Sequence, residues 1–181
     1  MPSSPIKVGF IGLSARGGWA SITHGPSLSL LSDKYTLTAV STSSPESASQ
    51  TADKFTKGTG HPVQAYHGST NGIANDPNVE LVAIAVKAPD HKKAALPAID
   101  AGKHIFLEWP AGASLAETVE LAEAAHRQGV RSLVGLQCRQ SRALKKVLVQ
   151  LDERRCAILN QFSGTGVAWR NWSSTIYDDC E

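Results

Sequence analysis

Residues 6–19 read IKVGFIGLSARGGW, an apolar run followed by a glycine-rich turn. The run 6–11 has the length and composition of a buried strand, and a helical pattern follows the turn. A strand that leads through such a turn into a helix is typical of the first unit of a dinucleotide-binding fold. Three glycine-like positions there make the turn, admit a diphosphate and let the helix pack on the strand. Gly12 and Gly17 fit the first and third positions, and Ser14 occupies the second.

This turn is therefore predicted to bind the diphosphate of NAD or NADP. A helix expected to begin near Arg16 would present free backbone N–H groups and about half a positive charge to the anion. Ser14 places a Cβ where a phosphate must approach, and it also brings a hydroxyl that can donate to a phosphate oxygen. The alternative interpretation is a glycine-rich turn without a ligand. The predicted contacts are Gly12, Leu13, Ser14, Ala15, Arg16 and Gly17.

Strand-like and helix-like segments alternate along the rest of the chain. Short connections between such segments require parallel strands, right-handed crossovers and helices on both faces. We therefore predict an α/β fold with a doubly wound parallel sheet of the Rossmann type over residues 1–152. Trp19 is expected to pack the first helix on this sheet. Further strands are predicted at 35–40, 63–66, 81–86, 104–107 and 130–136, and helices at 19–31, from 44 onward, 90–101, 115–128 and 141–151.

Composition excludes several classes of protein. The chain has 181 residues, of which 41% are hydrophobic and 19% charged, so it can bury a core and is no disordered tail. A net charge of +2 without a basic run argues against direct nucleic-acid binding. Three cysteines far apart predict neither a disulfide scaffold nor a metal site. No run approaches a membrane span and strand-like sequence begins at Ile6, so we expect a cytoplasmic protein, or a nuclear one if its role is regulatory.

The second predicted strand ends in the run 41–44, which reads Ser-Thr-Ser-Ser. Dinucleotide-binding folds usually place an acid here for the adenine ribose of NAD, or an arginine nearby for the phosphate of NADP. This chain has neither at that point, so the choice between NAD and NADP stays open. We predict that Thr42 and Ser43 contact the ribose or its phosphate. The alternative is that these hydroxyls only cap the helix that begins at Pro45.

Three segments resemble the Gfo/Idh/MocA (glucose–fructose oxidoreductase / inositol dehydrogenase) family. They are 7–12, 84–86 followed by His91, and 101–110, which reads AGKHIFLEWP. Within the family, residues 12–20, 108–109 and 136–139 look like the branch of the fungal galactose-pathway repressor, a NAD-binding regulator. The resemblance covers about residues 5–170. It implies an N-terminal domain that binds NAD or NADP and a C-terminal α/β domain for substrate contacts and dimerisation, of which residues 153–181 would be a remnant.

Two departures from the family weigh against ordinary dehydrogenase chemistry. Family enzymes carry Glu-Lys-Pro where this chain has Glu108-Trp109-Pro110, and their lysine exchanges a proton with the substrate hydroxyl. An indole only donates through its N–H, and loss of a general acid–base costs about 10²–10⁴-fold in rate. The chain also ends near the start of the second domain, so the family's Asp and His there have no counterpart. Both departures favour a regulatory or accessory protein.

Other candidates for the site follow predicted strands. Val86, His91, Glu108 and Trp109 are predicted to line the cofactor, and Lys87, His91 and Glu108 are candidates for catalysis, with Lys87 able to replace the missing lysine. The alternatives are a solvated helix start for His91 and a pocket shield for Trp109. No metal site is expected.

Three function classes stay open at this point. The first is a NAD(P)-binding regulator whose nucleotide changes its affinity for a partner. The second is an oxidoreductase acting on a sugar, polyol or secondary metabolite, completed by a partner or a dimer. The third is a non-redox isomerase or cyclase that reuses the cofactor cleft. Residues 156–162 are predicted to form a strand with an open edge, which would recruit a protein partner or a second copy.

Overall fold

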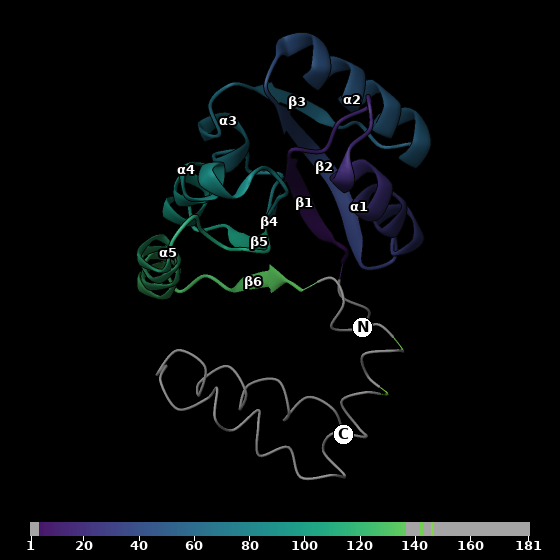
Figure 1. Cartoon of the computed structure of the whole chain (residues 1–181). Helices are drawn as coiled ribbons and strands as arrows, with labels where there is room; N and C mark the ends of the chain where they lie inside the picture. The colour runs from purple at the N-terminus through teal and green to yellow at the C-terminus, as the bar shows by residue number, and fades with distance from the viewer. Residues whose placement is uncertain (1–3, 137–141, 143–145, 147–181) are drawn as a thin grey trace. The chain divides into compact units, whose positions relative to one another are not determined.

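The computed structural model describes residues 4–136 together with Arg142 and Lys146, and these residues contain one parallel sheet flanked by helices (Figure 1). Its six strands lie in the order β3-β2-β1-β4-β5-β6, with every pair parallel. The predicted doubly wound Rossmann sheet is thus confirmed. The elements are β1 Ile6–Ile11, α1 Trp19–Leu30, β2 Tyr35–Thr42, α2 Pro45–Thr59, β3 Gln64–His67, α3 Asn71–Ala74, β4 Leu81–Ile84, α4 Ala88–Asp100, β5 His104–Glu108, α5 Leu115–Gln128 and β6 Ser132–Gly135.

Two apolar cores lie on the two faces of this sheet. On one face, Ala20 of α1 and Ala52 of α2 pack with Val8, Phe10 and other strand residues. On the opposite face, small and branched residues of α3, α4 and α5 pack on β4 and β5. The helices change face between β1 and β4, because the chain returns to the middle of the sheet at that point. A ligand crevice is expected where the winding reverses in this way.

Capping residues fix the helix boundaries that the sequence predicts. Ser44 caps α2 by accepting the backbone N–H of Ser47 at 3.2 Å, with Pro45 at the first helical position. Ser114 caps α5 by accepting from the Glu117 N–H at 3.2 Å. The Glu117 carboxylate accepts from the N–H of Ala113 at 2.9 Å, one residue before the partner expected for a capping box.

The AGKH segment of the family resemblance has a structural role. The Lys103 ammonium donates to the backbone oxygens of Asp76 at 2.9 Å and Val79 at 2.7 Å, and so closes the loop before β4. His104 accepts the backbone N–H of Arg131 through Nδ1 at 3.1 Å. The two bonds from the Lys103 ammonium are charge-assisted, and such bonds are about twice as strong as neutral ones. The segment therefore joins β5 to the loops at the amino end of the sheet, away from the predicted cofactor.

Several expectations were wrong in detail. The first helix begins at Trp19, which confirms the start of the predicted range 19–31 and not the start near Arg16 expected for the phosphate turn, because Gly18 and Gly17 have positive φ angles of 108° and 104° that no helix continues. Trp19 is 52% exposed and does not pack that helix on the sheet. The short α3 was not predicted, and the strand expected at 81–86 ends at Ile84.

Some expectations fall outside the described residues. These are the helix at 141–151 apart from Arg142 and Lys146, the strand at 156–162, the partner contact assigned to that strand, and the domain boundary at 152. Among the helices that the structure does describe, none has the length and apolarity needed to cross a membrane.

Candidate functional site

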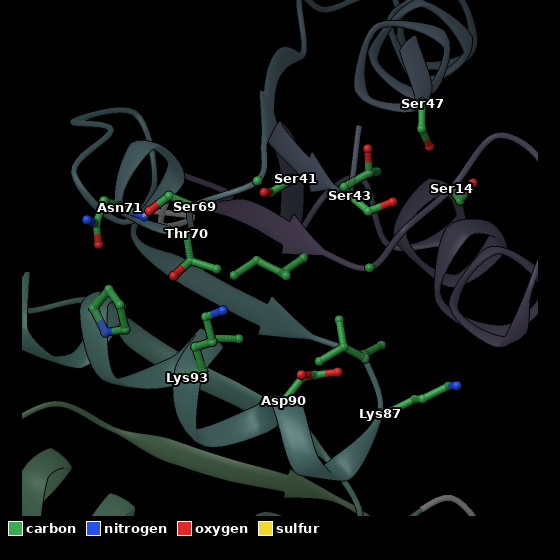
Figure 2. Close-up of a pocket in the computed structure, with 18 residues that line it drawn as sticks. Ser14, Ser41, Ser43, Ser47, Ser69, Thr70, Asn71, Lys87, Asp90 and Lys93 are labelled. Carbon is green, nitrogen blue, oxygen red and sulfur yellow. Dashed lines mark hydrogen bonds between the residues drawn. The ribbon is translucent and has the colours of Figure 1, made fainter. Parts of the chain in front are cut away.

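A cavity of about 1130 Å³ lies at the carboxyl edge of the sheet (Figure 2). Its walls come from the residues that follow β1, β2, β3 and β4 and from the first turns of α4. This is the point at which the winding of the sheet reverses, and ligands of open α/β sheets bind there. The volume suits a ligand larger than most single metabolites, since small-molecule pockets span about 300–1,000 Å³.

Gly12 brings the first loop against the loop after β4. Its φ is 93°, and a Cβ added to it would lie 2.4 Å from the carbonyl oxygen of Ala85. Only glycine fits this position, as the first glycine of the fingerprint requires. Gly17 differs: a Cβ there would meet no atom within 4 Å. The packing role predicted for Gly17 is therefore wrong. Glycine suits this position because the backbone φ there is 104°, which other residues rarely adopt.

The backbone N–H groups of the phosphate loop have partners inside the chain. The amide of Ser14 donates to Ser21 Oγ at 3.2 Å and that of Ala15 to Thr51 Oγ1 at 2.9 Å. The amides of Arg16 and Gly17 donate to the hydroxyl and the carbonyl of Ser14 at 3.2 and 3.3 Å. Free amides are therefore not found at residues 14–17, because hydroxyl groups of Ser21, Thr51 and Ser14 and the carbonyl oxygen of Ser14 accept from them.

Hydroxyl side chains form the wall beside the end of β2. Thr42, Ser43 and Ser47 line the cavity there, and Figure 2 shows Ser43 and Ser47 on the same side as Ser14. Thr42 Oγ1 donates to the backbone oxygen of Ser44 at 3.2 Å. Polar residues at the end of β3, Ser69, Thr70 and Asn71, extend this wall. They were not predicted, although their place directly after a strand was a usable signal.

The opposite wall comes from the end of β4 and from α4. Val86 and Lys87 line the cavity as predicted residues, and Asp90 and Lys93 join them from the first turns of the helix (Figure 2). Asp90 is the one carboxylate among the described residues of the lining. The charged groups of the cavity therefore gather on the α4 side, across from the hydroxyls of β2.

His91 lies inside the protein and not on the cavity wall. It is 1% exposed, with Nδ1 placed 2.8 Å from the Pro110 carbonyl oxygen and Nε2 placed 3.0 Å from the Val86 oxygen. The ring thus ties the loop after β4 to the loop after β5. The interpretation of His91 as a solvated helix start is wrong, because α4 begins three residues earlier and buries this position.

Glu108 also turns away from the cavity. It is 6% exposed and pairs with Nε2 of His24 from α1, so both partners are largely removed from water. The His24 ring lies between Phe10 and Phe106, with ring centroids 5.5 Å apart in each pair. The two partners are 84 positions apart, so no local sequence signal could indicate this contact.

Trp109 follows Glu108 at the carboxyl end of β5 and is 59% exposed. It is absent from the lining of the cavity that the described residues form. The same residues contain no group of three His, Cys, Asp or Glu side chains that could hold a metal ion.

A glycine turn at the switch point of a doubly wound sheet, beside a large cavity that hydroxyl and charged side chains help to line, defines a dinucleotide-binding Rossmann domain. Residues 6–136 match the family model described as "Oxidoreductase family, NAD-binding Rossmann fold". The chain belongs to this Gfo/Idh/MocA family, as the sequence resemblance implied.

Relatives of two kinds resemble the chain. The dehydrogenase aclE of Aspergillus oryzae is 38% identical over 144 residues, which make up 76% of this chain and 37% of that protein. The galactose/lactose metabolism regulatory protein GAL80 of Saccharomyces cerevisiae is 29% identical over 147 residues, 77% of this chain and 32% of that protein. A solved super-repressor mutant of Gal80p from the same yeast superposes with a TM-score of 0.73 at 26% identity, covering 82% of this chain and 39% of that one. The chain spans less than two fifths of each of these proteins.

Proposed function

We propose that the chain binds NAD or NADP in the cavity at the carboxyl edge and acts as a regulatory or accessory protein without ordinary dehydrogenase chemistry. The observation that carries the proposal is the turn at Gly12, which lies directly beside this cavity and at the switch point of the sheet. The polar walls offer hydroxyls and ammonium groups to a ligand that carries phosphates and sugars.

In this proposal the residues divide by the part of the nucleotide that they hold. The diphosphate lies beside Gly12 and Ser14. The amides of Arg16 and Gly17 exchange their long bonds of 3.2 and 3.3 Å for phosphate oxygens, since a charged acceptor attracts an N–H more strongly. The adenine ribose lies at Thr42 and Ser43, and the nicotinamide end at Val86. A bound nicotinamide nucleotide supplies hydride-transfer chemistry when a substrate and a proton carrier are also present.

The regulatory role rests on what the chain lacks at the end of β5. Trp109 stands where family enzymes have the proton-exchanging lysine, and its indole N–H only donates. Glu108 is engaged by His24 on the far side of the strand end. The likeness to the GAL80 regulatory protein supports the same role, in which bound nucleotide changes the affinity for a partner protein.

The alternative is an oxidoreductase acting on a sugar, polyol or secondary metabolite. Two observations favour it. Lys87 lines the cavity and is a residue that could exchange a proton there, and the dehydrogenase aclE is 38% identical to this chain. In this alternative, a second copy or another protein completes the substrate site.

Titration with NADH and NADPH tests the proposal. We expect saturable energy transfer from tryptophan to the reduced nicotinamide for at least one of them, and no turnover of polyols or sugars with the oxidised nucleotides.

Lys87→Ala should leave the nucleotide dissociation constant within about threefold of the wild-type value, since one exposed charge contributes little. The exposed Lys57→Ala of α2 is the matched control. Absence of binding to both nucleotides contradicts the proposal. Turnover that Lys87→Ala abolishes and Lys57→Ala spares establishes the oxidoreductase instead.

A further inference from the structure

The wall at the end of β2 carries no carboxylate. The lining residues there are Ser41, Thr42, Ser43 and Ser47, and the one acid of the described lining, Asp90, comes from α4. An acid at the end of β2 does two things in a dinucleotide site. It accepts hydrogen bonds from the ribose hydroxyls of NAD, and it repels the 2′-phosphate of NADP. Hydroxyl groups in its place accept the phosphate without repulsion, because each can donate to a phosphate oxygen.

The nearest acid along the chain, Glu46, is held elsewhere. It is the second residue of α2, and hydrogen bonds from its own backbone N–H and from the Ser44 hydroxyl lower its pKa, with smaller contributions from the charges of His67 and Arg16. Its carboxylate is thus engaged at the start of the helix. Glu46 therefore does not take the place of the missing acid.

A guanidinium reaches the same end of α2 from the phosphate loop. Arg16 Nε donates to Gln50 Oε1, in the second turn of α2, at 3.4 Å. The preceding residue, Ala15, is bonded on both sides to the same helix: its N–H donates to Thr51 Oγ1 at 2.9 Å, and its carbonyl oxygen accepts from Lys54 Nζ at 3.4 Å. The loop is thereby held against the first turns of α2, the helix that also carries Ser47 of the cavity wall.

We infer that the site selects NADP over NAD, with Arg16 as the counter-charge of the 2′-phosphate and Ser43 as its hydroxyl donor. This inference rests on the proposed dinucleotide binding. The end of β2 has no arginine of its own. Arg16 of the phosphate loop takes that role, because the contacts of residues 15 and 16 with α2 hold the loop against this helix. A guanidinium suits this task because its planar set of N–H donors matches two phosphate oxygens at once.

The test compares the two reduced nucleotides on the full chain by titration. We expect NADPH to bind at least about tenfold more tightly than NADH, since charge-assisted bonds to a phosphate supply that much discrimination. Arg16→Gln should weaken NADPH binding by about tenfold and leave NADH binding within about twofold. Arg127→Gln on α5, an exposed arginine far along the chain, is the matched control and should change neither. Ser43→Asp should reverse the preference, because it restores the acid.

The outcomes separate this inference from the proposed function. If NADH binds as tightly as NADPH or more tightly, the inference is overturned and the dinucleotide site stands. If Arg16→Gln weakens both nucleotides equally, Arg16 contacts the diphosphate that they share, and the inference is again overturned. If neither nucleotide binds to the wild-type chain, the proposed function fails and the inference fails with it.

Discussion

Replacing Gly12 with alanine is expected to lower the free energy of unfolding by about 2–5 kcal/mol, because the new Cβ meets both backbone strain and a steric clash. The φ of Gly12 is 93°, where an L-residue is strained in any surroundings. The added Cβ would also lie 2.4 Å from the Ala85 carbonyl oxygen, a backbone atom that cannot rotate away. The loops after β1 and β4 would have to separate. Urea denaturation followed by circular dichroism measures the change.

Gly129→Ala is the control for Gly12→Ala. Gly129 ends α5 with a φ of 65°, and a Cβ there meets no atom within 4 Å. This variant bears the conformational strain alone, about 1–2 kcal/mol. The difference between the two variants measures the close approach of the loops. Equal losses in both variants would show that Gly12 is needed only for its backbone angles, contrary to this account of the cavity wall.

Replacing His91 with leucine should lower the free energy of unfolding by about 2–5 kcal/mol, since buried carbonyl groups that lose a partner cost about 1–3 kcal/mol each. The ring is 1% exposed, and its nitrogens lie within hydrogen-bonding distance of the Val86 and Pro110 oxygens. Leucine fills the space but offers no N–H to either oxygen. The same denaturation measurement applies, with exposed His61→Leu as the control, for which a change within about 0.5 kcal/mol is expected.

Substitutions of His91 also distinguish a structural role of the ring from direct binding of the nucleotide. A structural ring predicts that His91→Gln, which keeps a donor, recovers part of the lost stability. A ring that served the nucleotide directly would leave stability unchanged on replacement and reduce only nucleotide binding. That second pattern would contradict the structural role assigned to His91.

The fold followed from the sequence because its signals are local. The apolar run 6–11, the glycine turn and the cap residues Ser44 and Ser114 each fix neighbouring backbone, and the alternation of strands with helices then leaves few topologies. Boundaries were less secure. The helical pattern indicated a helix at 19–31, whereas the phosphate-turn argument expected its start near Arg16; the positive φ angles of Gly17 and Gly18 show that the turn continues to Trp19.

The site was harder to predict because its contacts join distant segments. Lining residues that directly follow a strand, such as Ser43 and Lys87, could be found from the fold alone. The pairing of Glu108 with His24 across 84 positions could not, and it decides on which side of the strand end the carboxylate lies. The same holds for Arg16, whose contact with Gln50 depends on the packing of the loop against α2.

A crystal structure of the chain grown with saturating NADPH would show directly whether a dinucleotide lies in the cavity beside Gly12. We expect density for the diphosphate next to Ser14 and for the adenine ribose next to Ser43, between the ends of β1, β2 and β4. A structure that shows this cavity fully formed and empty, or the nucleotide bound at another surface, would contradict this expectation.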